Sequence, residues 1–341
     1  MDANKKKINN LFLYWLTLCL LLVFFIIIVG GLTRLTNSGL SITKWELFKG
    51  ILPPLSQSSW EFYFDEYKKI PQYQLMNDKM NIGQFKVIFY WEYFHRFLAR
   101  IIGLTFLLPL IYFYFTKKIT KKKINTCFII FSLILLQGFI GWYMVMSGLI
   151  NNVSVSHYRL SIHLSLAFII ISAIFWLILN ILKQSEKNFF VYSKKNIYFI
   201  IFIFLIFLQI ILGAFVSGLD AGRIYQTWPL MGNTYFPNDI FLEKLNNLIQ
   251  FTNHSLVQFY HRNLAYFILF YFLILSIYIY KNNLKCLFRP LILVIISLLL
   301  QIILGIFTLL SGLDIYLASA HQISSVILVF TAINLYYYQA K

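Results

Sequence analysis

The sequence predicts an all-α polytopic membrane protein with eight transmembrane helices, arranged as two parallel-repeat four-helix bundles. Three observations support this prediction. The chain of 341 residues is 60% hydrophobic and only 12% charged, more apolar surface than a water-soluble protein of this length could bury. It contains eight apolar runs, each long enough to cross a bilayer, which takes about 20 residues. Motifs in the first four runs also recur in the last four.

The apolar runs begin near positions 10, 92, 125, 160, 196, 258, 290 and 318. The first follows a basic start, but it has spanning length and lacks a small-residue cleavage site, so we interpret it as a helix rather than a cleaved signal peptide. A long outer loop, about residues 31–90, separates the first two runs. Its segment 60–69 (WEFYFDEYKK) is amphipathic and is expected to form a helix that lines an outer membrane face.

The second half of the chain repeats the first. Residues 137–141 (QGFIG) match residues 301–305 (QIILG). One offset also relates three further pairs: Gly30 and Gly213, Gly39 and Gly222, Trp45 and Trp228. Each half has four runs, an even number, so both halves should have the same orientation, as in a parallel repeat. We therefore predict two domains, residues 1–183 and 184–341. Small residues are expected to let helices approach closely, namely Gly138, Gly141, Gly305 and Ser311.

The net charge of +17 reflects membrane topology rather than nucleic-acid binding. The basic residues concentrate between alternate apolar runs, whereas the opposite segments are short or mixed in sign. By the positive-inside rule, both termini should lie in the cytoplasm or its mitochondrial equivalent. The chain lacks the Arg- and Ser-rich stretch of a mitochondrial presequence, which favours the bacterial inner membrane, where its partner is the lipid bilayer. The basic residues are Lys5, Lys6, Lys7, Lys117, Lys118, Lys121, Lys122, Lys123, Lys183, Lys187, Lys194, Lys195, Lys281, Lys285, Arg289 and Lys341.

The three cysteines do not form a recognisable disulfide or metal motif. Cys19, Cys127 and Cys286 lie far apart, in or beside the apolar runs. They contain no CxxC pair. We therefore expect all three to be small packing residues.

Four histidines lie in the apolar runs at matched positions. Residues 92–96 (EYFHR) correspond to 258–262 (QFYHR), and 159–165 (RLSIHLS) to 317–324 (LASAHQIS). An ionisable residue inside a membrane is costly and so marks a functional site. The four fall near the outer ends of the even-numbered runs, at similar depth: His95, His163, His261 and His321. Two imidazoles on parallel helices can ligate a haem iron from both faces.

Other uses of the histidines fit less well. Zinc or copper would recruit further Cys, Asp or Glu ligands, and only Glu92 is close enough in the sequence. A proton relay would need acidic residues across the membrane, and the inner half has none. Haem is therefore the best fit. Iron with two histidine ligands has no open position for dioxygen unless one leaves, which favours electron transfer.

The two halves differ at one informative position. Glu92 lies three residues before His95, on the same helical face, whereas its counterpart is the amide Gln258. A carboxylate beside one site suggests proton-coupled chemistry there, with Glu92 as base or charge stabiliser. The alternative is a salt bridge from Glu92 to Arg96, four residues on. Five arginines could contact haem propionates or simply snorkel to the interface: Arg34, Arg96, Arg159, Arg223 and Arg262.

Several motifs resemble haem A synthases, in the branch shared by alphaproteobacteria and mitochondria. The similarity lies in residues 30–41 (GGLTRLTNSGLS), 50–56 (GILPPLS), 85–96 (FKVIFYWEYFHR) and 227–231 (TWPLM). With the remaining histidine segments, it covers nearly the whole chain. Some family members have a cysteine pair in the first outer loop, and this chain has none there, so a thiol relay at that place is excluded.

This resemblance implies oxidation of the C8 methyl of the substrate haem O to the formyl of haem A, for cytochrome c oxidase assembly. The steps would pass through hydroxylated intermediates, with water rather than dioxygen as the oxygen source. His95 and His163 would hold the substrate haem, with Glu92 as the catalytic carboxylate. His261 and His321 would hold a haem b cofactor. The haem sites would lie toward the periplasmic side. Haem O synthase and a second copy of the chain are candidate partners.

Two other functions stay open. A di-haem b electron-transfer protein, such as a quinol-linked membrane cytochrome, would hold both haems permanently. A haem transporter or chaperone would bind haem and leave it unchanged. The difference between Glu92 and Gln258 favours the enzyme.

Overall fold

The computed structural model describes residues 3–45, 49–150, 152–190, 193–240 and 250–340. Within these ranges the chain is helical, and it forms no β-strand there. The side chains of Lys5, Lys6 and Lys7, and the whole of Lys341, lie outside the described part. Their predicted place in the topology is therefore not addressed by the structure.

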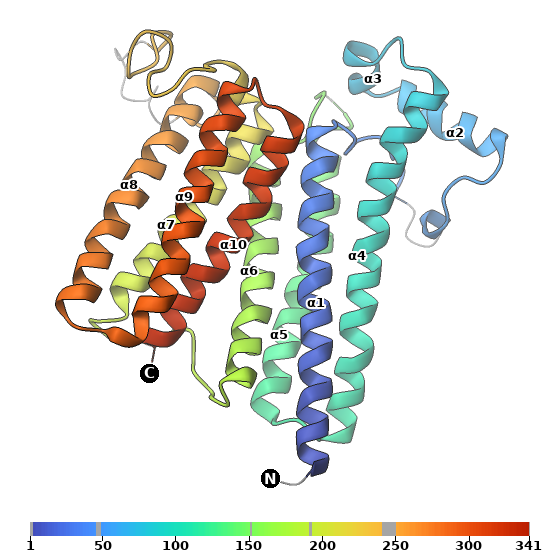
Figure 1. Ribbon diagram of the computed structural model, residues 1–341. Helices are drawn as coiled ribbons and strands as arrows, with labels where there is room; N and C mark the ends of the chain where they lie inside the picture. The colour runs from blue at the N-terminus through green and yellow to red at the C-terminus, as the bar shows by residue number, and fades with distance from the viewer. Residues whose placement is uncertain (1–2, 46–48, 151, 191–192, 241–249, 341) are drawn as a thin grey trace. The chain divides into compact units, whose positions relative to one another are not determined.

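Among the described residues, eight helices are long and apolar enough to cross a membrane, which confirms the predicted all-α polytopic fold. The grouping of these helices into two repeated bundles stays a prediction. Their bounds are α1 (Ala3–Leu35), α4 (Ile82–Thr116), α5 (Lys121–Met146), α6 (His157–Leu182), α7 (Ile197–Gly218), α8 (His254–Lys281), α9 (Phe288–Leu310) and α10 (Ile315–Gln339) (Figure 1).

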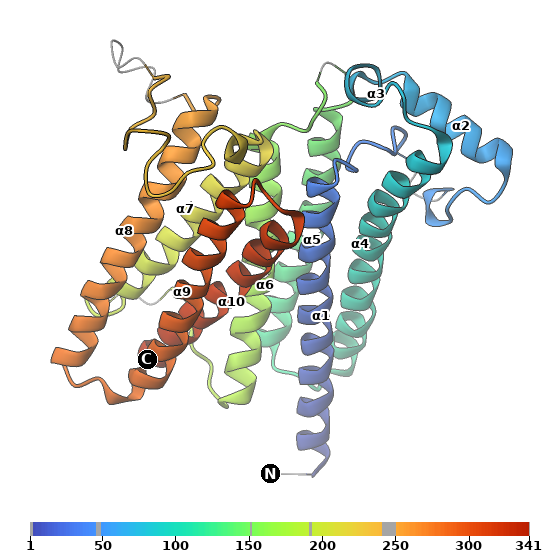
Figure 2. The same ribbon diagram turned by 45° about the horizontal axis from the view of Figure 1, so that its top comes forward.

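The chain divides into two compact units, Met1–Ile174 and Phe175–Lys341, with the boundary inside α6. In the first unit α4 contacts both α1 and α5. In the second unit α7 contacts α8, and α10 contacts both α9 and α7. Of these antiparallel neighbours, α1 and α4 lie side by side in both views, as do α9 and α10 (Figures 1 and 2). Short 3-10 helices lie outside the long helices: η1 (Lys49–Ile51), η2 (Ala221–Arg223) and η4 (Lys285–Leu287).

The amphipathic segment of the first outer loop forms α2 (Gln57–Lys68), followed by α3 (Pro71–Met76). Its apolar face contacts the start of α4, and its expected place along an outer membrane face stays a prediction. Trp60, Phe64 and Tyr67 are buried in one cluster with Phe85 and Phe89. Their aromatic rings interlock with centroids 5.0–5.8 Å apart, a favourable range for aromatic pairs. Helix α2 therefore packs over the N-terminal end of α4 (Figure 2).

Helix α4 begins ten residues before the apolar run that predicted it. Asn81 and Gln84 form a capping box, in which each side chain accepts from the backbone N–H of the other residue. Such a box satisfies two helix-terminal donors and starts a helix in polar sequence. The apolar run excludes these polar residues, so it places the start of α4 too late. His95 consequently lies well inside α4 rather than near its end.

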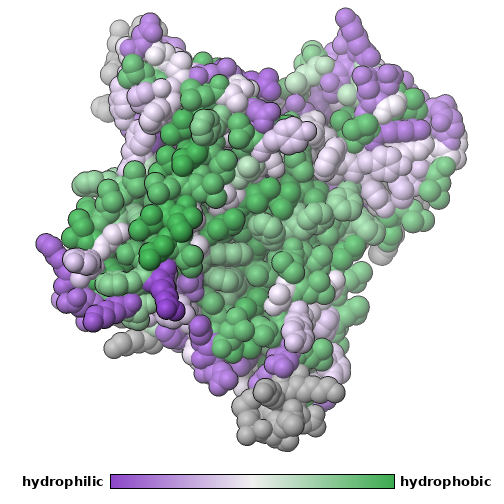
Figure 3. Space-filling view, in the orientation of Figure 1, coloured by the Kyte–Doolittle hydropathy of each residue, from purple (hydrophilic) through white to green (hydrophobic). Residues whose placement is uncertain are grey.

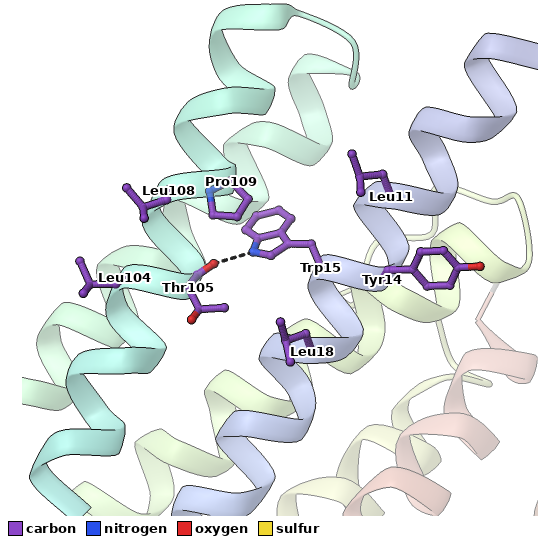
Figure 4. Close-up of a pocket in the computed structure, with 8 residues that line it drawn as sticks. All are labelled: Leu11, Tyr14, Trp15, Leu18, Leu104, Thr105, Leu108 and Pro109. Atoms are coloured by element: carbon purple, nitrogen blue, oxygen red, sulfur yellow. Dashed lines mark hydrogen bonds between the residues drawn. The ribbon is translucent and has the colours of Figure 1, made fainter.

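A tryptophan on α1 supplies a hydrogen bond that a proline within α4 cannot make. Pro109 has no backbone N–H, so it cannot donate to the carbonyl of Thr105 four residues earlier. The indole N–H of Trp15 donates to that carbonyl at 2.8 Å. The bond lies beside an apolar surface pocket of about 420 Å³ between α1 and α4 (Figure 4). The bond therefore attaches α1 to α4 where α4 lacks its own donor.

The sequence predicts Lys187 only as one of the basic residues that set the membrane topology. In the structure it also binds the C-terminal end of α10. Its ammonium group donates to the carbonyls of Tyr337 (2.9 Å) and Ala340, at the C-terminal end of α10. Burial lowers the pKa of this ammonium group. A cation at a helix C-terminus is favourable because it satisfies terminal carbonyls and interacts with the helix dipole.

Hydrophobic side chains cover the long helices, and hydrophilic ones gather near the helix ends (Figure 3). This distribution fits a lipid-facing surface. Two of the cysteines, Cys19 and Cys127, are buried as expected. The expectation is wrong for Cys286, which is exposed, because it lies in η4, outside the apolar core of α9.

Candidate functional site

Each of the four predicted histidines lies on its own spanning helix. His95 is on α4, His163 on α6, His261 on α8 and His321 on α10. All four side chains are half-buried. Each Nδ1 atom is buried and has no hydrogen-bond partner in the described part of the chain. A buried polar atom without a partner is costly unless a ligand or water satisfies the site.

A glycine on the preceding helix contacts each imidazole. A Cβ atom built on any of these glycines would lie only 2.9–3.1 Å from the Cε1 atom of the ring. Any larger residue would therefore displace the ring. The pairs are Gly30 and His95, Gly141 and His163, Gly213 and His261, Gly305 and His321. Gly141 and Gly305 thus act in close contact as predicted, whereas a Cβ on Gly138 would find none of the described atoms within 4 Å.

Three of the histidines also receive a hydrogen bond from a glutamine on the same neighbouring helix. Gln137 donates to the backbone carbonyl of His163 at 3.0 Å. Gln209 donates to His261, and Gln301 to His321, both at 2.9 Å. Each glutamine precedes the contacting glycine by four residues, so both lie on one helical face. Glutamine and glycine together hold the histidine from one side.

Each predicted pair falls within one compact unit. His95 and His163 lie in the first unit, and His261 and His321 lie in the second. No group of three or more His, Cys, Asp or Glu side chains suited to a metal ion occurs among the described residues. Protein zinc sites need three or four such ligands, whereas a haem iron needs only two imidazoles. The donor set, the unpartnered nitrogens and the glycine contacts fit haem.

Glu92 is buried beside the first pair, only 3% exposed, and all its hydrogen-bond partners are donors. One carboxylate oxygen accepts from the Ser41 hydroxyl at 2.7 Å and from the Ile42 N–H at 2.8 Å. The other forms a salt bridge with Arg96. Arg96 also donates to the carbonyl of Ile42 at 3.0 Å and lies over the Trp45 ring. Glu92 and Arg96 therefore fasten the first outer loop onto α4.

The corresponding positions of the second unit fasten a loop in a different way. Gln258 and Arg262 both donate to the carbonyl of Tyr225, at 2.8 and 2.9 Å. The Tyr225 hydroxyl in turn donates to Asp239, which also accepts from Ser255. Burial raises the pKa of Asp239, but these two hydrogen bonds bring it below its usual range. An amide can donate to a carbonyl as a carboxylate cannot, so the change from Glu to Gln reverses the polarity of this contact.

The other three candidate arginines are Arg34, Arg159 and Arg223. Arg34 donates to Asn37 at 3.0 Å. Arg159 donates to the Tyr143 carbonyl at 2.7 Å and stacks over the Tyr143 ring. Arg223 is exposed at the end of η2. Their contacts with propionates stay a prediction.

The sequence reasoning missed Gln209 and the loop partners of Glu92. Gln209 could have been found, because it precedes Gly213 by the same four residues that separate Gln137 from Gly141. Ser41 and Ile42 lie about fifty residues before Glu92 in the chain, and no local pattern connects them. Only the fold of the outer loop brings them together.

These observations define a class of protein: a polytopic helical membrane protein with a histidine on each of four spanning helices, each histidine in close contact with a glycine of another helix. The chain belongs to the COX15-CtaA family of cytochrome oxidase assembly proteins, whose sequence model matches residues 13–333.

Relatives with curated names agree with this membership. The chain is 49% identical to the heme A synthase of Pelagibacter ubique, over 96% of both chains. It is 41% identical to the heme A synthase of Flavobacterium psychrophilum, over 95% of this chain and 97% of the relative. It is 39% identical to that of Rickettsia canadensis, over 96% and 98%. The likeness therefore extends over nearly the full length.

Proposed function

We propose that the chain is a haem A synthase, which converts the C8 methyl of haem O to the formyl of haem A for cytochrome c oxidase assembly. One observation carries this proposal. His95 and His261 lie in matched motifs, but His95 follows the buried carboxylate Glu92 by three residues where His261 follows the amide Gln258. Relatives at up to 49% identity are named heme A synthases.

The proposed reaction uses water as the oxygen source. Water adds an oxygen as the methyl loses two electrons and two protons, giving a hydroxymethyl group. A second such oxidation gives a gem-diol, which loses water to form the aldehyde. The net change consumes one water and releases four electrons and four protons. A site for this reaction must stabilise positive charge on the oxidised substrate and receive protons.

The first histidine pair would hold the substrate and the second the cofactor. His95 and His163 would ligate the iron of haem O, while His261 and His321 would ligate a haem b. When bound, haem b supplies one-electron transfer, which is its own chemistry. The protein would supply position and electrostatics. The glycine and glutamine contacts described above support this positioning role of the protein, since they hold imidazoles at fixed places.

Glu92 is better placed to stabilise charge than to act as a free base. Both of its oxygens are occupied by donors from Ser41, Ile42 and Arg96. To take a proton from water it would first have to release one of them. A fixed carboxylate close to the substrate can stabilise developing positive charge without moving, which preorganised groups do at little cost.

We further propose that the protein lies in the bacterial inner membrane with both termini in the cytoplasm and both haem sites toward the periplasm. The lysines that separate alternate spans support this orientation. Haem O, a membrane-soluble substrate, would come from haem O synthase, and self-association of the chain is a further possibility to test by its size in detergent.

Pigment analysis tests the proposed function. The protein is purified from cells with and without a co-expressed haem O synthase, and its extracted pigments are separated by chromatography. We expect haem b in both preparations and haem A only with the synthase. Glu92→Gln should accumulate haem O or a hydroxylated intermediate, while the matched control Gln258→Glu should still give haem A.

Other outcomes would support other functions. Haem b alone under both conditions, with no effect of Glu92→Gln, would indicate a di-haem b electron-transfer protein. Haem O bound but never converted by the unaltered protein would indicate a transporter or chaperone.

A further inference from the structure

The four histidines are held unequally. His163, His261 and His321 each receive a glutamine amide from the neighbouring helix, at 2.9–3.0 Å from the backbone carbonyl. The amides of Gln137 and Gln209 also lie 3.4 and 3.5 Å from the ring Nε2 of their histidines. That of Gln301 donates to the Ser324 hydroxyl at 2.6 Å as well.

His95 lacks such a bond. The residue four before its contacting glycine, Gly30, is Ile26, which has no donor. Across the described part of the chain, no side chain donates to the His95 carbonyl, although Gly30 contacts its ring as closely as the other glycines contact theirs. The same arrangement thus occurs four times, with the glutamine missing only at His95.

The glutamine bond links two helices at the level of the imidazole. The histidine carbonyl already has a donor within its own helix, so the amide adds a second, interhelical bond. In membrane proteins one such bond changes an equilibrium by about three-fold, and the strongest by somewhat more than ten-fold. That is enough to distinguish a ligand that stays from one that leaves.

Helices α1 and α4 also leave an apolar groove of about 580 Å³ between them. Its lining includes Val29 and Phe94, which neighbour Gly30 and His95 in the chain and therefore lie on the adjacent helical faces. The groove shows that these two helices are not fully packed against each other on that adjacent side.

We propose that Gln137, Gln209 and Gln301 are positioning residues for three of the histidine ligands, and that Ile26 leaves His95 free to swing aside. This inference rests on the proposed function, in which one haem is exchanged and the other retained. The retained haem would have both ligands held, at His261 and His321. The exchanged haem would have one held ligand, His163, and one releasable ligand, His95.

Haem dissociation measures this difference. The protein is purified with its pigments from cells that co-express haem O synthase, then mixed with excess apomyoglobin, which takes up released haem. Chromatography of the transferred pigment separates haem b from haem O and its oxidised products. Ile26→Gln should slow the release of the latter group by about three- to ten-fold. Gln137→Leu should accelerate the same release, and Gln209→Leu should accelerate the release of haem b.

Two further measurements separate positioning from general destabilisation. Gln137→Leu should shift the low-spin electron paramagnetic resonance signal of the first-site haem, which depends on imidazole orientation, and leave the second signal unchanged. Ile130→Gln on α5, a buried apolar position remote from the histidines, should alter the melting temperature of the protein without selectively slowing the release of one pigment.

The proposal fails if Ile26→Gln leaves the release rate of the first-site pigment unchanged in a folded protein that retains its haems. It also fails if Gln137→Leu and Gln209→Leu change both release rates equally. The identity of the pigments tests the proposed function, whereas their release rates test the positioning. If only haem b is found, two release phases that respond to different glutamines would still support the positioning, and the synthase proposal alone would fail.

Discussion

At the scale of single residues, one substitution between the two halves changes what an outer loop is attached to. Glu92 accepts a peptide N–H and a hydroxyl from the loop, whereas Gln258 donates to a loop carbonyl. Glu92 forms a salt bridge with Arg96, four positions later, whereas Gln258 and Arg262 both donate to the carbonyl of Tyr225. The loops beside the two sites are thus fixed by opposite polarities, and of these two matched positions only Glu92 can carry a negative charge.

The Glu92–Arg96 pair should contribute separately to stability and to chemistry. Glu92→Gln leaves the largely buried Arg96 without its counter-charge, which should cost about 3 kcal/mol of unfolding free energy. Adding Arg96→Gln removes the unpaired charge and should recover part of that loss, but it should not restore haem A formation. Thermal unfolding and pigment extraction on the single and double variants measure the two effects. Recovery of haem A in the double variant would show that the carboxylate has no chemical role.

The contacting glycines allow a matched comparison within α5. Gly141→Ala places a methyl group about 3 Å from the His163 ring, and overpacking of this kind costs about 1–3 kcal/mol. We expect reduced haem in the first site and a lower melting temperature. Gly138→Ala, three residues earlier, meets open space. It should leave the haem content unchanged and change the free energy of unfolding by no more than about 1 kcal/mol. Equal effects of the two substitutions would contradict a specific contact with His163.

At the scale of elements, hydropathy predicts which segments span the membrane but does not predict where those helices begin. Eight apolar runs correspond to eight helices, because spanning demands apolar length. The early start of α4 depends on Asn81 and Gln84, two polar residues outside that run. Segment 60–69 was correctly expected to be helical, since its amphipathic period is local. Its partner was not predictable, because contact with Phe85 and Phe89 depends on how the loop folds back onto α4.

The bond between Trp15 and the Thr105 carbonyl should matter because Pro109 is present. Trp15→Phe removes the indole donor and should cost about 1 kcal/mol. In a Pro109→Ala background the backbone N–H of residue 109 can serve the same carbonyl, so the same substitution should cost less. A double-mutant cycle by thermal unfolding in one detergent measures the coupling. Additive effects of the two substitutions would show that the indole contributes only by packing in the pocket of Figure 4.

At the scale of the whole molecule, the histidine pairs were predictable because duplication shows itself as repeated motifs. Their place in apolar runs and in matched motifs predicts His95, His163, His261 and His321, and the structure places each of them on a separate spanning helix. Their pairing around haem stays a prediction. Repeated motifs do not show where matched histidines contact different residues. The missing glutamine at Ile26 became visible only when the other three glutamines were found beside histidines.

The proposed orientation of the whole chain can be tested with its own cysteines. Cys19 and Cys127 are buried, while Cys286 is exposed in η4, between α8 and α9. If both termini are cytoplasmic, η4 is too, because an even number of spans precedes it. A membrane-impermeant maleimide should therefore label Cys286 in inside-out vesicles and spare it in right-side-out ones. In a Cys286→Ser background, Lys79→Cys in the exposed turn after α3 should give the reverse pattern. Labelling of both positions from one side would overturn the orientation, and with it the assignment of the haem sites to the periplasmic half of the membrane.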